Sequence, residues 1–373
     1  MSMGDDKNVP PYFFLPPEAS KRTTELTLDG AYDLTPSEAL WRDRFLSLKS
    51  QGYDLRPRYS PKWKPSWMDT NLDPEFCEDA IMSSDPYVMD ARRQSDGLLV
   101  AVKSVKKDSQ ELQIARFLTS LEHRENHCVE VVDVLEDSLD TTCSIMVMKY
   151  LRQFDDPEFV MVGDVVDFVS QMLEGLAFLH RQRVAHRDIA PPNIMMDGSA
   201  LYPRGHHPVW TDCSPDIVEE LKPLLRMDHP VKYFYVDFGL SVRFEPDASP
   251  YVVGDVGRDA EVPELSSTVP YDAFKADIYA LGNLFDKEFV QKYHSVDFLC
   301  ELVDAMKRRQ PSLRPTAVEL IEMFRKARRT LGPSAFRWRL SPKSQPAYER
   351  LFNDTVAAAK DGFSHLRRFV RPT

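Results

Sequence analysis

The chain has 373 residues, of which 43% are hydrophobic and 28% are charged, and its formal net charge is −11 at pH 7. This length allows two domains or two lobes with a substantial core, and the composition is that of a globular protein. The acidic balance argues against nucleic acid as the main partner, because a phosphate backbone requires a basic surface.

The cysteines and the hydropathy pattern bear on the cellular compartment. Five cysteines are scattered without metal-type spacing, which favours reduced thiols. The N-terminal sequence has no basic region followed by an apolar one, and no stretch is long and apolar enough for a membrane span. We therefore expect a monomeric cytoplasmic or nuclear protein that does not contact a membrane.

Residues 1–80 predict an N-terminal extension that is partly extended and lies over the domain. They hold nine of the 28 prolines, and only Pro36–Gly52 has an apolar period typical of a helix. Leu55–Trp67 interleaves basic and aromatic residues, as segments that stack on single-stranded nucleic acid also do. Because the chain as a whole is acidic, we favour a segment that is clamped to the fold.

Residues 81–151 combine strand-like runs with one helix. The helix is expected to start at a capping residue, Asp108 or Ser109, and to carry the apolar residues Ile114, Leu118 and Leu121 on one face. Glu111 falls on the same face, and a carboxylate that points inward needs a cation as its partner.

Residues 152–334 are mostly helical. Apolar spacings of three and four mark Val165–His180, and further helical patterns occur in residues 298–309 and 317–331. A small β-rich lobe followed by a larger helical lobe is an α+β arrangement. Residues 335–373 are expected to form a C-terminal tail.

Three motifs follow one another along the chain. VAVK ends in Lys103, VAHRDIAPPNIMMD contains Asp188 and Asn193, and YFYVDFGLS contains Asp237. Together with the inward-facing Glu111, this series resembles the signature set of the eukaryotic protein kinase family, in particular the divergent kinase-like proteins of fungi. The resemblance covers residues 81–331. It implies a two-lobed protein kinase fold, with a small β-rich N-lobe at 81–151 and a larger α-helical C-lobe at 152–334.

The resemblance also implies phosphoryl transfer from ATP with Mg²⁺. Lys103, held by Glu111, is expected to pair with the ATP phosphates, and Asp188 to accept the proton of the acceptor hydroxyl. Asn193 and Asp237 are expected to hold the magnesium ions. The resemblance assigns further residues to the catalytic loop and to the nucleotide surface: Arg187 to the loop, and Val88, Ala101, Met148, Tyr150 and Met195 to the surface.

Other matches concern architecture. Val262-Pro263-Glu264 is similar to the family's Ala-Pro-Glu motif. By analogy, Glu264 should form a buried ion pair with Arg314, and Asp277 should brace the catalytic loop from beneath. These residues support the fold and carry no information on catalysis.

Two departures from the family concern phosphate contacts. Its three loop glycines are replaced by Ile81, Ser83 and Pro86, so fewer backbone N–H groups can approach phosphate, and nucleotide binding should be weaker. Ala190 and Pro192 stand where the family usually has a lysine or arginine that faces the transferred phosphate. Transition-state stabilisation is lost there unless another cation substitutes.

Two further departures concern spacing. Asn193 and Asp237 are separated by an apparent insertion at about residues 198–231, which we interpret as a surface interaction loop. Its histidines and cysteine fit no standard zinc pattern: His206, His207, Cys213 and His229. Asp277 and Arg314 are only 37 residues apart (314 − 277), which leaves little room for the family's substrate-docking helix.

These observations favour a divergent, ATP- and magnesium-dependent protein kinase of reduced activity that phosphorylates serine or threonine rather than tyrosine in a protein substrate. The rival hypothesis is a pseudokinase that serves as a scaffold for a binding partner, and a third is a small-molecule kinase of the same fold. Ser241, Ser249 and Tyr251 lie where a phosphate could pair with Arg187.

Overall fold

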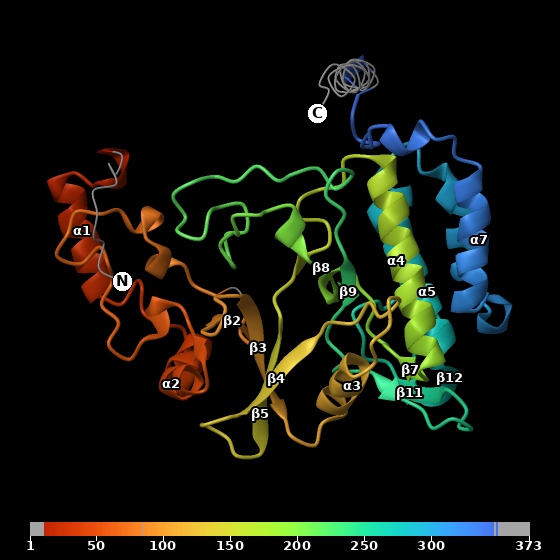
Figure 1. Cartoon of the computed structure of the whole chain (residues 1–373), viewed down its shortest axis with the longest axis horizontal. Helices are drawn as coiled ribbons and strands as arrows, with labels where there is room; N and C mark the ends of the chain where they lie inside the picture. The colour runs from red at the N-terminus through yellow and green to blue at the C-terminus, as the bar shows by residue number, and fades with distance from the viewer. Residues whose placement is uncertain (1–10, 84, 347, 350–373) are drawn as a thin grey trace. The chain divides into compact units, whose positions relative to one another are not determined.

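The computed structural model describes residues 11–83, 85–346 and 348–349, and these form two compact units (Figure 1). Unit 1 comprises the described residues up to 107 together with 131–150 and 202–223. Unit 2 comprises 108–130, 151–201 and the described residues from 224 onward. The expected extension and tail therefore lie partly outside the described residues, at 1–10 and 350–373.

Unit 1 contains a five-stranded antiparallel sheet of order β1-β2-β3-β5-β4 (Figure 1). Its register sets Lys103 of β3 opposite Val88 of β2 and Met146 of β5. The strands are β1 (Tyr53–Asp54), β2 (Val88–Arg93), β3 (Leu99–Lys106), β4 (Val131–Glu136) and β5 (Cys143–Lys149). The sequence did not predict β1, which the N-terminal extension adds to the sheet.

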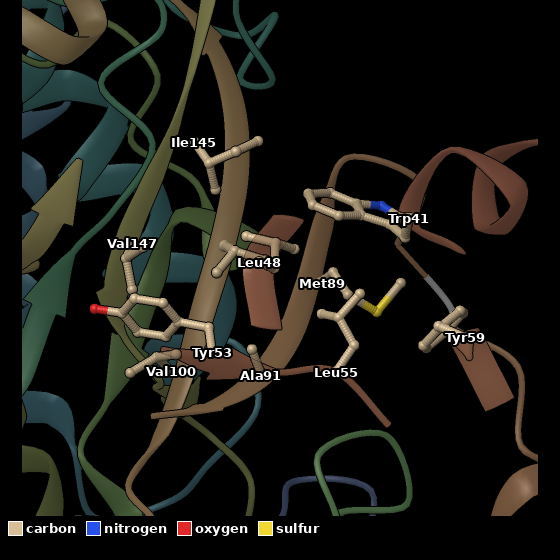
Figure 2. Close-up of a cluster of buried hydrophobic side chains, with 11 residues drawn as sticks. Trp41, Leu48, Tyr53, Leu55, Tyr59, Met89, Ala91, Val100, Ile145 and Val147 are labelled. Atoms are coloured by element: carbon tan, nitrogen blue, oxygen red, sulfur yellow. The ribbon is translucent and has the colours of Figure 1, made fainter. Parts of the chain in front are cut away.

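One face of this sheet is buried against the extension. Val100 and Val102 of β3 point into a core that also contains Trp41 and Leu48 of helix α2 (Pro36–Ser50), and Figure 2 shows most of these side chains. Side chains alternate along a strand, so Ala101 and Lys103 lie on the opposite face of β3.

The predicted helix in the extension is confirmed as α2, and Thr35 and Glu38 form a capping box at its start. Glu38 also pairs with Arg58, whose side chain is fully buried, and accepts a hydrogen bond from the Tyr59 hydroxyl. The basic and aromatic segment is therefore clamped to the fold. The remaining helical segments of unit 1 are α1 (Pro17–Leu28) and the short 3-10 turns Pro11–Phe13, Pro57–Tyr59, Pro74–Phe76 and Glu78–Ala80.

Unit 2 is mainly helical, which together with the sheet of unit 1 confirms the α+β class. Helix α4 packs beside α7 (Figure 1). The helices are α3 (Gln110–Thr119), α4 (Val162–Arg181), α5 (Ala273–Phe285), α6 (Cys300–Met306) and α7 (Ala317–Arg329). The strands are β6 (Arg152–Gln153), β7 (Val184–Ala185), β8 (Ile194–Met196), β9 (Tyr233–Tyr235), β10 (Val242–Arg243), β11 (Tyr251–Gly254) and β12 (Ser266–Asp272). Shorter turns occur at Pro191–Asn193, Gly198–Ala200, Asp286–Val290, Asp297–Leu299, Pro311–Leu313 and Ala335–Arg337.

Local signals predicted helix α3 correctly. Ser109 is its N-cap, and the Ser109 hydroxyl accepts the backbone N–H of Leu112. Ile114 and Leu118 are buried as expected, but the helix ends at Thr119, so the prediction that Leu121 belongs to it is wrong. Helix α6, which lies between Asp277 and Arg314, has only seven residues, in line with the short spacing there.

The predicted insertion is the long connection between β8 and β9, which pair as antiparallel neighbours. Residues 202–223 of this connection belong to unit 1. His207 is buried and lies 3.4 Å from Glu78 Oε1, and the Tyr150 hydroxyl donates to the carbonyl oxygen of Pro208 at 2.8 Å. The insertion is therefore partly packed into unit 1 and is not only a surface loop.

A buried histidine in unit 2 should make the protein sensitive to acid. His127 Nδ1 lies 2.8 Å from the Tyr233 carbonyl oxygen, and the ring sits in the interior. Burial lowers the pKa of His127 from 6.5 to about 4, although the hydrogen bond opposes this shift. The unfolded chain therefore binds this proton more readily than the folded one, and the stability present above pH 6.5 is lost as the pH falls toward 4.

We expect His127 to account for a loss of about 2 kcal/mol in unfolding free energy between about pH 7 and about pH 5. In the variant His127→Gln the side chain can still donate to the Tyr233 carbonyl but does not titrate in this range. Urea unfolding of both proteins at the two pH values measures the difference. Equal pH dependence in wild type and variant would contradict the prediction.

Candidate active site

The catalytic loop follows β7 and is held from below by α5. Asp277 of α5 accepts the backbone N–H of His186 at 2.9 Å and that of Arg187 at 2.7 Å, and its carboxylate also meets His180 Nε2 at 3.0 Å. Arg187 has a φ of 66°, a conformation that costs energy for a residue with a side chain. The two hydrogen bonds that the buried Asp277 carboxylate accepts stabilise this turn. This confirms the prediction that Asp277 braces the catalytic loop.

His186 links the catalytic loop to the strand before Asp237. Its Nε2 lies 3.0 Å from the Val236 carbonyl oxygen, and its Nδ1 accepts the backbone N–H of Asp188 at 3.3 Å. Complete burial lowers the pKa of His186, although the nearby carboxylate of Asp277 opposes this. The imidazole is therefore neutral and acts as a structural bridge.

Asp188 and Asn193 are in direct contact. Asn193 Nδ2 donates to Asp188 Oδ2 at 2.7 Å and to the Asp188 carbonyl oxygen at 2.8 Å. Both side chains are almost completely buried. These bonds fix the orientation of the Asp188 carboxylate and turn the amide oxygen of Asn193 away from it.

The third motif lies beside helix α3. Asp237 has a φ of 62°, the second residue of the site in a conformation that favours glycine. A Cβ atom on Gly239 would come within 3.2 Å of Asp237 Oδ1 and 3.7 Å of Glu111 Oε2. The carboxylates of Asp237 and Glu111 therefore both lie close to the backbone of Gly239 in unit 2.

The oxygen donors of this loop suit a hard divalent cation. The carboxylate of Asp237 and the amide oxygen of Asn193 are the types of ligand that Mg²⁺ prefers. The described residues contain no group of three or more His, Cys, Asp or Glu side chains arranged to hold a metal ion. Asp237 and Asn193 are thus the residues that could hold Mg²⁺, an ion usually bound by one or two protein ligands together with phosphate oxygens.

In unit 1, the residues expected at the nucleotide lie on one face of the sheet. Ala101 pairs with Met148 across β3 and β5, and Lys103 pairs with Val88 across β3 and β2. Directly opposed residues share a face, as do residues two apart along a strand. Tyr150 directly follows β5, and Met195 belongs to β8 in unit 2. The expected pair of Lys103 and Glu111 joins residues of different units and stays a prediction.

A search of protein families matches residues 86–293 to the protein kinase domain. This match covers more than half of the chain. The chain belongs to the protein kinase domain family. Over 64 residues this chain is 39% identical to the serine/threonine-protein kinase CAK1 of Saccharomyces cerevisiae, a match that covers 17% of this chain and 16% of that protein. The similarity to this fungal kinase thus spans about a sixth of either length.

The family match begins at residue 86 and so includes Pro86 but leaves out Ile81 and Ser83, the other two residues of the segment that replaces the glycine loop. In this kinase domain, carboxylates of the chain itself accept hydrogen bonds from backbone N–H groups at residues 83, 87 and 88. The Ser83 N–H donates to Glu38 Oε1 at 3.3 Å, and Asp85 Oδ1 accepts the N–H groups of Tyr87 and Val88 at 2.7 and 3.0 Å. Because the two carboxylates already accept hydrogen bonds from these N–H groups, the same N–H groups are not available to bind a phosphate.

Ile81 is tied back in the same way, because its carbonyl oxygen accepts a hydrogen bond from Arg56 Nη1 at 2.8 Å. Arg56 also binds Asp90 Oδ1 at 3.2 Å, and burial raises the pKa of Asp90 although Arg56 opposes this shift. The segment that replaces the glycine loop is thus anchored to the extension and to β2.

The buried ion pair expected in the kinase domain is confirmed. Arg314 Nη2 lies 2.8 Å from Glu264 Oε2, and Nη1 bonds the other oxygen of the same carboxylate. The Arg314 side chain is fully buried, and it also donates to the carbonyl oxygens of Lys275 and Arg308 at 2.7 Å each.

The structure bears on the hypothesis that Ser241, Ser249 or Tyr251 is phosphorylated and that the phosphate pairs with Arg187. Ser241 is 2% exposed and donates to the His186 carbonyl oxygen at 3.0 Å, so its hydroxyl is not accessible in this conformation. The Arg187 guanidinium donates to the carbonyl oxygens of Leu240 and Val253 at 3.2 Å each. Ser249 and Tyr251 are exposed, and phosphorylation at either of them stays a prediction.

Sequence reasoning missed Arg258, which contacts Asp188 through both its backbone and its side chain. The signal available was a basic residue between the second metal motif and Glu264, in a chain that lacks the usual cation in the catalytic loop.

All five cysteines lie in the described part and are free thiols. No helix among the described residues is long and apolar enough to cross a membrane.

Proposed function

We propose that this kinase domain transfers the γ-phosphoryl group of ATP to a serine or threonine hydroxyl of a protein substrate, at a reduced rate. The observation that carries the proposal is the catalytic loop, in which Asn193 holds the Asp188 carboxylate and Asp277 holds the backbone of the two preceding residues. A side chain fixed in this way can orient a hydroxyl and receive its proton without reorganisation. The similarity to a fungal protein named as a serine/threonine-protein kinase supports serine or threonine as the acceptor.

In the proposed reaction, Asp188 accepts the proton of the acceptor hydroxyl as the hydroxyl oxygen forms its bond to the γ-phosphorus. Lys103, with Glu111 as its partner, holds the ATP phosphates, and Asn193 and Asp237 hold Mg²⁺. When bound, Mg²⁺ neutralises part of the charge on the phosphate oxygens. Val88, Ala101, Met148, Tyr150 and Met195 line the nucleotide, and Arg187 positions the loop.

The reduced rate follows from the segment that replaces the glycine loop. Glu38 and Asp85 already bind three of its amides, so little of the ATP affinity can come from backbone N–H groups. Most of it must come from Lys103 and from the metal. The same observation favours the second candidate function, a pseudokinase that binds a partner protein and transfers no phosphate.

Nucleotide binding should therefore depend strongly on Mg²⁺. ATP at about 100 times its dissociation constant adds about 2.7 kcal/mol to the stability of the folded state. We expect ATP with Mg²⁺ to raise the melting temperature by about 3–4 °C for a chain of this length, and ATP with a chelator to raise it far less. Asp237→Asn should remove most of the shift, since the variant loses a charged metal ligand.

Differential scanning fluorimetry over a series of ATP concentrations measures this shift. Asp247→Asn, an exposed aspartate in the same unit, is the matched control and should keep the full shift. If millimolar ATP gives no shift with or without Mg²⁺, the phosphotransfer proposal fails and the scaffold function takes its place.

A further inference from the structure

Arg258 meets the expected catalytic base at two points. Its backbone N–H donates to Asp188 Oδ1 at 2.7 Å, and its guanidinium Nε lies 3.6 Å from Asp188 Oδ2. The Asp188 side chain is 9% exposed and that of Arg258 is 54% exposed. The guanidinium therefore reaches the carboxylate from the solvent side, where a substrate hydroxyl and a phosphate would have to enter.

The backbone at residues 257–259 lies close to the catalytic loop and to α5. A Cβ atom on Gly257 would come within 3.3 Å of the Arg187 carbonyl oxygen and 3.8 Å of Asp188 Oδ1, so a larger residue would push the segment away from the loop. On the other side, Asp259 Oδ2 accepts a hydrogen bond from buried Asn283 of α5 at 2.7 Å. Of the two residues next to Arg258, Gly257 thus packs against the catalytic loop and Asp259 is bonded to α5.

The catalytic loop itself offers no cation at this place. Ala190 is 7% exposed and Pro192 has no charge, at the positions where a lysine or arginine would face the transferred phosphate. A phosphoryl group in transfer carries negative charge on its three equatorial oxygens, and an arginine can bind two of them with its planar fork of N–H donors. Arg258 has the charge and the location that the loop lacks.

We propose that Arg258 is a catalytic residue that supplies the missing cation and contacts the transferred phosphoryl group beside Asp188. This inference rests on the proposed phosphotransfer. In the step, the acceptor oxygen forms a bond to the γ-phosphorus, the bond from that phosphorus to the β,γ-bridging oxygen breaks, and ADP leaves with the electron pair. The hydroxyl proton passes to Asp188, while the guanidinium stabilises the negative charge on the phosphoryl oxygens and is not itself changed.

The contact with Asp188 has a structural alternative, in which Arg258 only ties its segment to the loop. The backbone N–H of Arg258 makes the shorter of the two contacts, and it remains in any side-chain variant. A variant of the guanidinium therefore separates the two roles. Arg258→Met keeps the stem and removes the charge, and Arg258→Lys keeps a single positive charge without the fork.

Steady-state phosphate transfer to dephosphorylated casein, together with Mg·ADP affinity in the presence and absence of aluminium fluoride, tests the proposal. We expect Arg258→Met to lower kcat about 100-fold with little change in KM for ATP, the size of effect seen when one transition-state donor is removed. Aluminium fluoride mimics the phosphoryl group in transfer, so it should tighten ADP binding in wild type and not in Arg258→Met. Arg258→Lys should recover part of both effects.

The matched control is Arg325→Met, because Arg325 is 58% exposed and also pairs with a carboxylate, that of Glu322. It should behave like wild type. If Arg258→Met equals wild type in kcat and in the effect of aluminium fluoride, the role of Arg258 is overturned while the phosphotransfer proposal stands. If Arg258→Met weakens ADP binding and lowers the melting temperature together, the residue is structural and the inference is also overturned. A wild-type protein that neither phosphorylates casein or itself nor hydrolyses ATP would overturn the proposed function.

Discussion

Replacing Arg314 by alanine is expected to destabilise the protein by about 3–5 kcal/mol, because the carboxylate of Glu264 is then left without its cation in a mostly buried position. The guanidinium bonds both carboxylate oxygens and two backbone carbonyl oxygens, and it lies over the ring of Tyr279 at 4.7 Å. All of these groups lose a partner at once. Arg314→Lys should recover only part of the stability, since an ammonium cannot bond the carboxylate in the same two-oxygen geometry.

Urea unfolding of the purified variants measures this effect. The control is Arg124→Ala, because Arg124 is 89% exposed, 3.8 Å from Glu125, and such surface pairs contribute little. A loss in Arg314→Ala no larger than that of the control would show that the ion pair does not stabilise the C-terminal helices.

Changing Lys103 to methionine should reduce phosphate transfer by at least about 100-fold, because the loss removes a fixed cation from the charge that develops on the phosphates. The methionine side chain can fill the volume of the lysine stem, so the melting temperature should stay close to that of wild type. The sheet register supports the expectation of an unchanged melting temperature, since Lys103 lies between Val88 and Met146 on the face opposite the core of Figure 2.

The matched control for this variant is Lys106→Met. Lys106 is exposed at the end of β3 and, three residues along the strand, points to the opposite face from Lys103. Transfer assays with labelled ATP compare the two variants. Activity near the wild-type level in Lys103→Met, with a loss in Lys106→Met, would assign the phosphate contact to the other lysine.

Several local features of the fold and of the candidate site follow from residues that are close in sequence. Asp188 and Asn193 are five residues apart on one loop, so the contact between them needs only the local turn. The cap at Ser109, the helix that follows it and the alternating strand that carries Lys103 are also set by neighbouring residues. The order of these motifs along the chain was enough to place it in its family.

The contacts that modify this site were decided by the tertiary structure. Arg258 follows Asp188 by 70 residues, Ser83 follows Glu38 by 45, and His207 follows Glu78 by 129. None of these pairs lies in a periodic pattern, because each joins a loop to a distant segment through one or two polar atoms. Helical and strand periods report which face of an element is buried. They carry no information on which carboxylate a distant loop amide or guanidinium will meet, since that depends on where packing of the whole unit leaves the two backbones.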